Sequence, residues 1–173
     1  MSLRNFAVPL LLLISVSAAA QRDNPTASQI IQRAIDSSGG DAKFANQHAA
    51  EFTAQLTLAD GQSISLAIKR KDFNKYYISN LSLGHVNSTT IYNNGKAVII
   101  KNDSVTPITD PQTLEDLQLQ CYISLDYGYK KLGYKLTRLE DFKFGNFDCY
   151  TVLAESALGI KTINYYDKNK GRL

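Results

Sequence analysis

Strict alternation of apolar and polar side chains, beginning near Ala50, most constrains what this chain can fold into. A period of two gives a β-strand one apolar face and one polar face. Asp60-Gly61 interrupts the pattern with a two-residue turn of the kind that closes hairpins. The segment therefore predicts an antiparallel hairpin with one apolar face. Its alternating apolar side chains are Phe52, Ala54, Leu56 and Leu58 before the turn and Ile64, Leu66 and Ile68 after it.

Further strand patterns follow this hairpin. Residues 76–78, 89–92 and 97–101 extend it to a five-stranded meander, and Asn94-Gly95 supplies a second turn of the same chemistry. Strand patterns resume at residues 134–140, 148–154 and 160–166. Ten Tyr and seven Phe, with no Trp, favour pleated, half-buried surfaces over helical bundles. We predict an α+β fold that is mainly β.

Helical patterns are short. Asn24-Pro25 is typical of a helix start, apolar residues recur at helical spacing, and Gly39-Gly40 ends the pattern. We therefore predict one amphipathic helix over residues 25–38, lying across the sheet. A helical turn is expected within residues 41–48, and a short helix or helical loop within residues 107–120, around Pro111.

The N-terminus has the pattern of a secretory signal. Arg4 precedes an apolar run over residues 6–16, and small residues follow at 18–20. The run is much shorter than the ~20 residues of a membrane-spanning helix, so a retained anchor is the weaker alternative. We expect cleavage between Ala20 and Gln21, leaving residues 21–173 as a single domain in the periplasm.

Export makes a disulfide feasible, and the chain has two cysteines, Cys121 and Cys149. A bridge between them would add roughly 3–4 kcal/mol of stability. The alternative is two small buried side chains. The sequence does not fix the register of these segments, so both alternatives stay open.

The sequence offers little material for catalysis. His48 and His85 are its only histidines, and neither belongs to a paired metal-ligand pattern. Nucleophile-elbow and phosphate-loop motifs are missing from the sequence. A net charge of +3, from interspersed charges, does not make the basic stripe that nucleic acid requires. We expect no catalytic residue, metal or cofactor, and no nucleic-acid partner.

Five segments together resemble the LolA-like family of exported bacterial proteins, the periplasmic lipoprotein carriers and outer-membrane lipoprotein-sorting proteins. They are residues 30–40, 92–96, 129–136, 145–150 and 165–171. The resemblance implies a curved antiparallel half-barrel with helices as a lid over an apolar cavity for acyl chains. Family carriers place a basic residue at the cavity, and the sequence does not choose among Lys69, Arg70 and Lys71.

On this reading the partner is a lipoprotein acyl chain or another lipid, the protein is a monomer, and it makes transient contact with a membrane. The helix over residues 25–38 and the second helical segment form the lid. The cavity residues are expected to be Phe52, Leu56, Leu58, Ile64, Leu66, Ile68, Tyr76, Ile78 and Ile91. The lid residues are expected to be Ile30, Ile31 and Ile35.

The competing hypothesis is an interaction module of the envelope, such as one associated with an exported peptidase, that binds a protein partner through a free sheet edge. A third reading, an enzyme, would need a site joining Cys or His to carboxylates. The last strand pattern is followed by a turn and then Leu173, so we expect either an unpaired sheet edge there or a chain truncated relative to its relatives.

Overall fold

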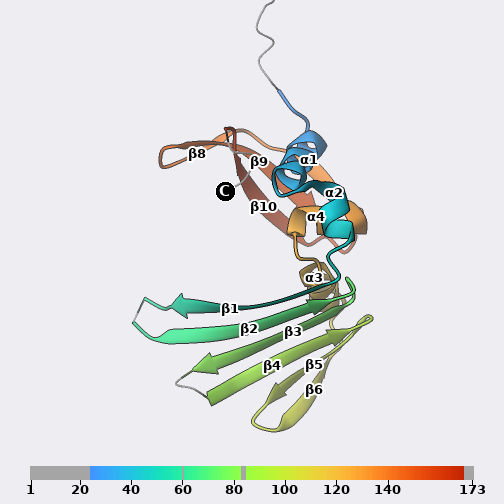
Figure 1. Ribbon diagram of the computed structural model, residues 1–173, viewed down its shortest axis with the longest axis vertical. Coiled ribbons are helices and arrows are strands. Elements are labelled where there is room, and N and C mark those ends of the chain that lie inside the picture. The colour runs from blue at the N-terminus through green and yellow to red at the C-terminus, as the bar shows by residue number, and fades with distance from the viewer. Residues whose placement is uncertain (1–23, 60, 83–84, 170–173) are drawn as a thin grey trace, which may run out of the picture.

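The computed structural model describes residues 24–59, 61–82 and 85–169 and contains an antiparallel sheet of six strands in sequence order (Figure 1). The first hairpin is confirmed: Phe52 pairs with Ile68, and Thr57 pairs with Ser63 beside the turn. Asp60 of that turn lies outside the described residues. The strands are β1 (Ala49–Thr57), β2 (Ser63–Lys71), β3 (Lys75–Ser82), β4 (His85–Asn93), β5 (Lys96–Lys101) and β6 (Ser104–Ile108).

The register of this sheet sorts its side chains onto two faces. Phe52, Ile68 and Ile78 lie opposite one another on successive strands and therefore share one face, which we call the inner face. Thr53 and Ala67 belong to the other face, the outer face. A strong hydrophobic pattern on the inner face fixes this register, because a slip of one residue would exchange the two faces.

A second sheet follows the helices. Its order is β10-β9-β7, and β8 also pairs with β9. The alternating pattern predicted three of these strands, whereas the three-residue β8 was not predicted. The strands are β7 (Lys135–Arg138), β8 (Phe142–Phe144), β9 (Phe147–Glu155) and β10 (Lys161–Asp167).

Two of the helices were expected at the N-terminus and both are present, α1 (Ala27–Ser37) and α2 (Gly40–Ala45). Thr26 caps α1: its Oγ1 accepts from the Gln29 amide at 3.3 Å, and its amide donates to Gln29 Oε1 at 2.8 Å. This reciprocal capping box satisfies two of the free donors at a helix start.

Helix α3 (Pro111–Gln120) confirms the helical segment expected within residues 107–120, whereas α4 (Leu125–Leu132) was not predicted. Helix α4 is only eight residues long, and its central glycine weakens the helical pattern in the sequence. Gly128 is required by packing, because a Cβ there would lie 2.8 Å from the Leu119 side chain of α3. Ser124 caps the start of α4, and Gly133 ends it in the left-handed region at φ 71°.

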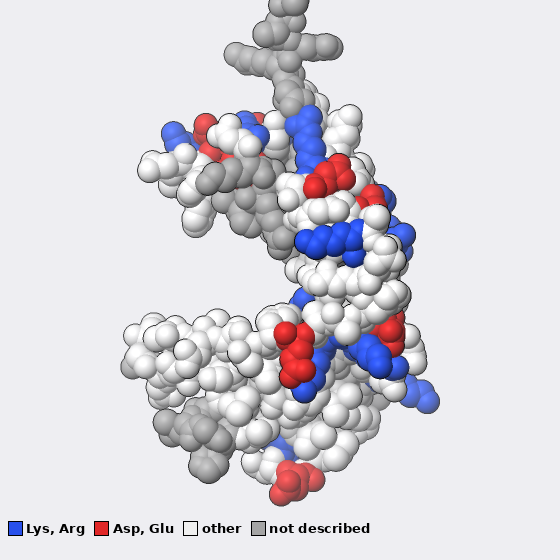
Figure 2. Space-filling view, in the orientation of Figure 1, with Lys and Arg blue, Asp and Glu red and all other residues white. Residues whose placement is uncertain are grey.

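The two sheets form two lobes joined by α3 and α4, and a wide notch separates them (Figures 1 and 2). Leu117 of α3 and Cys121, the residue that caps its C-terminal end, pack on the inner face of the six-stranded sheet. The same helix reaches the second sheet through Ser156 Oγ, which donates to Glu115 Oε2 at 2.5 Å. Helix α3 therefore holds the lobes on either side of the notch.

Helix α1 packs in a different place from the one expected. Ile30, Ile31 and Ile35 are buried in a cluster with Tyr150 and Val152 of β9. The cluster that contains inner-face residues of the six-stranded sheet includes residues of α3 and none of α1. The apolar stripe of α1 thus belongs to the core of the second lobe, together with Tyr166 of β10.

The expected signal segment, residues 1–20, lies outside the described residues. Within the described part of the chain, no helix has the length and apolar character needed to cross a membrane.

Both cysteines are buried free thiols in the structure. Cys121 packs against the inner face of the six-stranded sheet, whereas Cys149 lies on β9 opposite Phe142 and Asp167. Burial raises the pKa of the Cys121 thiol to about 12, although the nearby Arg70 charge acts to lower it.

We predict that Ile35→Ala will lower the free energy of unfolding by about 2–5 kcal/mol, because Ile35 is fully buried and the change leaves a cavity. Ile163→Ala is the matched control, since Ile163 is 52% exposed, and its cost should stay below about 1 kcal/mol. Denaturant titration of both variants measures the difference. Equal losses would contradict the core that α1 forms with the second sheet.

We predict that neither thiol of the folded protein reacts with a disulfide reagent at pH 8, because both are buried and the reagent cannot reach them. Unfolding in guanidinium without reductant should expose both thiols to the reagent. A chain that shows no reactive thiol after unfolding would instead carry the Cys121–Cys149 bridge.

Candidate functional site

The inner face of the six-stranded sheet is covered at one end only. Ile68, Tyr76 and Tyr92 are buried beneath α3, together with Leu117 and Cys121. Toward the opposite end the cover stops: Phe52 is 40% exposed and Leu56 is 49% exposed. Figure 2 shows that the described side chains at the free tip of the β1–β2 hairpin are uncharged. An apolar strip therefore borders the notch.

Eight of the nine expected cavity residues are found along this strip or at its end. Ile64, Leu66 and Ile78 are half-buried inner-face residues, and Leu58 follows the end of β1 with 42% of its surface exposed. Phe52, Leu56, Ile68 and Tyr76 complete the set on the inner face.

Ile91, the ninth expected cavity residue, lies on the outer face. The register pairs it with Tyr77, which in turn pairs with Lys69. The sequence pattern around residues 89–92 is apolar or small at adjacent positions, so it did not reveal which side of the strand faces the notch.

One charged side chain lies among the inner-face residues of β1, β2 and β3, and it is Arg70. Its Nη1 donates to the carbonyl of Ile123 at 3.3 Å. Its guanidinium carbon lies 5.2 Å from the ring centre of Phe52 and 6.0 Å from that of Tyr76. Stacking of this kind holds a cation against an apolar surface.

The Arg70 guanidinium retains unused hydrogen-bonding capacity. Its buried Nε has no hydrogen-bond partner, and none of the ion pairs found in the described part of the chain includes Arg70. Burial lowers the pKa of the guanidinium, while the neighbouring Tyr76 and Cys121 side chains act to raise it. Since a buried donor without a partner is costly, this group is poised to donate to an oxygen ligand.

Arg70 also lines a pocket of about 330 Å³ at the junction of the two lobes. The other walls come from the start of α4, including Asp126, and from β10. Tyr166 Oη donates to Asp126 Oδ1 at 2.6 Å, so the carboxylate is already engaged. The pocket is lined by Arg70, Ile123, Leu125, Asp126, Asn164, Tyr165 and Tyr166.

The arrangement fits an elongated amphipathic molecule. An apolar chain would lie along the strip between Leu56 and Ile78, and an oxygen-bearing head would lie in the pocket that Arg70 lines. The sequence alone left Lys69, Arg70 and Lys71 equivalent. Strand parity separates them: Arg70 points inward with Leu66 and Ile68, whereas its two neighbours point outward.

Comparisons with known proteins give structural neighbours only. No family model matches the sequence, and no curated protein is significantly similar to it. A LolA superfamily protein from Nitrosomonas europaea superposes with a TM-score of 0.48 and 11% identity, over 86% of this chain and 69% of that protein. A domain from Vibrio parahaemolyticus, described as an outer membrane lipoprotein-sorting protein domain, superposes with a TM-score of 0.48 and 12% identity. The match covers 84% of this chain and 69% of that domain.

Proposed function

We propose that this protein is a non-catalytic carrier that holds the acyl chain of a lipoprotein or another lipid against the inner face of the six-stranded sheet. The observation that carries the proposal is the uncovered apolar strip with an arginine at its inner end that belongs to none of the ion pairs found between described residues. Exposed apolar surface of this kind is costly in water unless a ligand or partner covers it. The head of the ligand, a carboxylate or ester carbonyl, would accept from the guanidinium of Arg70, which lines the pocket at the junction of the lobes.

The energetics suit reversible binding. Burying an acyl chain contributes ~0.8 kcal/mol per CH₂, so a 16-carbon chain offers on the order of 12 kcal/mol. Association costs an estimated 4–15 kcal/mol, and a free chain can also partition into a membrane. A carrier with an open notch would therefore hold lipid with modest net affinity, as delivery to another acceptor requires.

The cellular setting belongs to the same proposal. A cleaved N-terminal signal would place the protein in the periplasm, where an acyl chain in transit between membranes needs shelter from water. In that setting a monomer would suffice, because the notch and Arg70 belong to a single chain.

A second candidate, an envelope interaction module, is favoured by one observation. Strand β1 is the edge of the six-stranded sheet, and most of its residues are exposed. A partner peptide could add to this edge through main-chain hydrogen bonds. Native mass spectrometry of protein purified from a bacterial periplasm separates the two candidates: co-purified lipid supports the carrier, and a lipid-free mass without uptake on incubation supports the module.

We predict that Leu56→Glu will abolish binding of palmitate, because it places a charge on the apolar strip where the chain would lie. Gln55→Glu is the matched control, since Gln55 is exposed on the outer face of the same strand. Titration with a fluorescent fatty acid, with circular dichroism to check folding, measures both. Unchanged binding by a folded Leu56→Glu variant would exclude the inner face as the ligand site.

We predict that Arg70→Leu will remove the preference for an anionic head. The measurement is the ratio of the dissociation constants for palmitate and hexadecanol, which share the same chain. A charge-assisted hydrogen bond contributes about 1.5–3 kcal/mol, so the wild-type preference for palmitate should be about tenfold or more and should fall to near one in the variant. A ratio that does not change would show that Arg70 does not contact the head.

A further inference from the structure

The outer face of the six-stranded sheet carries its own uncovered apolar rows. Tyr77, Ile91 and Val98 lie opposite one another on β3, β4 and β5, and Pro107 of β6 continues the row. In the next row Ile100 pairs with Val105, which is 60% exposed. Neither hydrophobic cluster of the described residues includes a strand residue of this face. These rows are therefore open to a partner.

Lysines mark one end of the same face. Lys71 pairs directly with Lys75, Lys75 with Asn93, and Asn93 with Lys96, so three lysines share one cross-strand row. Lys69 lies in the adjacent row, beside Tyr77. Like charges directly opposite one another destabilise a sheet unless an anion lies between them. The row of lysines would therefore be more stable with an anion bound than without one.

The acidic residues nearby do not neutralise this row. Glu51 contacts Lys69 at 2.9 Å, and Asp72 contacts Lys75 at 3.7 Å. Lys71 and Lys96 enter no ion pair found between described residues. Four lysines therefore face two carboxylates, which leaves an excess of positive charge at the lysine end of the outer face.

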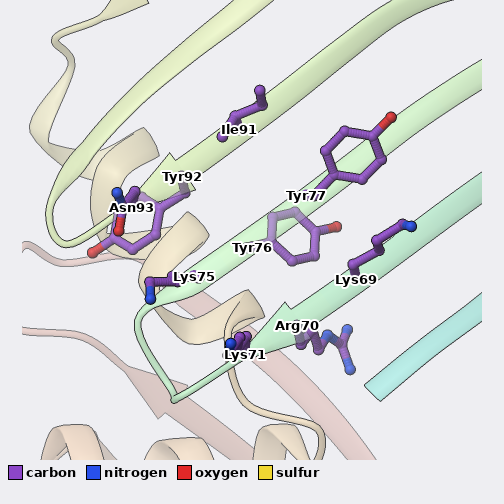
Figure 3. A pocket seen from close by; sticks show the side chains of 9 residues that line it. All are labelled: Lys69, Arg70, Lys71, Lys75, Tyr76, Tyr77, Ile91, Tyr92 and Asn93. Atoms are coloured by element: carbon purple, nitrogen blue, oxygen red, sulfur yellow. The ribbon is translucent and has the colours of Figure 1, made fainter. Parts of the chain in front are cut away.

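A pocket of about 240 Å³ lies where the lysines meet the apolar rows (Figure 3). Tyr77 and Ile91 contribute outer-face side chains, and Lys69, Lys71 and Lys75 surround them. Arg70, Tyr76 and Tyr92 also border the pocket, although their side chains belong to the inner face. No residue of α3 lines it, which agrees with its place on the outer face.

We propose that the outer face docks on the surface of an anionic lipid bilayer. Headgroup phosphates would lie between Lys71, Lys75 and Lys96, and the row of Tyr77, Ile91 and Val98 would rest at the boundary of the acyl region. A bilayer fits better than an acidic peptide because it presents a layer of anions beside an apolar layer over a broad plane. This surface is opposite the proposed lipid-binding face and goes beyond the carrier function.

The test is co-sedimentation with vesicles at low ionic strength. We expect the wild type to bind vesicles of phosphatidylglycerol and phosphatidylcholine and to ignore vesicles of phosphatidylcholine alone. Each lysine near an anionic surface strengthens binding about fivefold, so Lys71→Gln with Lys75→Gln should weaken it about 30-fold. Val105→Ser should also weaken it, because it removes apolar surface from the docking face.

Lys135→Gln with Lys143→Gln is the matched control, since both lysines are exposed on the second sheet and the net charge of the two double variants is equal. This control should bind as the wild type does. Equal weakening by the two double variants would overturn the proposal, because attraction would then follow net charge. Equal binding of the wild type to both vesicle types would also overturn it. Leu56→Glu should keep vesicle binding while losing palmitate, so the two proposals can fail separately.

Discussion

The packing of α3 on the inner face of the six-stranded sheet is the contact on which the rest of the structure depends. Leu117 and Cys121 bury Ile68, Tyr76 and Tyr92 at one end of the sheet. A helix of ten residues is about 15 Å long, and neighbouring strands lie about 4.8 Å apart, so it cannot cover a face six strands wide. The open strip and the notch are therefore consequences of this partial cover.

The sequence predicted the sheet well because alternation is a local signal. Phe52, Leu56 and Leu66 reveal the inner face without any knowledge of the second lobe. Where local signals are weak the predictions fell short. Gly128, which close packing against Leu119 requires, weakens the helical pattern of α4. Strand β6 includes Pro107, which is tolerated because β6 is an edge strand. Which sheet α1 would cover depends on contacts between distant segments, so the sequence could not decide it.

The candidate site could be predicted only in part for the same reason. Its apolar lining follows from strand parity, whereas Ile91 was assigned to the wrong side because β4 lacks a clear alternation and is bulged opposite Asn80 and Leu81. The importance of Arg70 depends on the side of β2 that α3 covers and on the carbonyl of Ile123, which is distant in sequence. Strand parity turns Arg70 inward and its two lysine neighbours outward, and the C-terminal end of α3 lies near the arginine.

Strand β2 thus places a half-buried arginine on one face of the sheet and two exposed lysines on the other. Arg70 is half-buried against the rings of Phe52 and Tyr76, where the low dielectric would strengthen a single hydrogen bond to the proposed ligand head. Lys69 and Lys71 point to water, where screening weakens each contact and only several lysines acting together attract a surface. Neighbouring positions of a strand face opposite sides of the sheet. The same short segment can therefore bind a specific ligand on the inner face and a charged surface on the outer face. A substitution on one face need not disturb binding on the other.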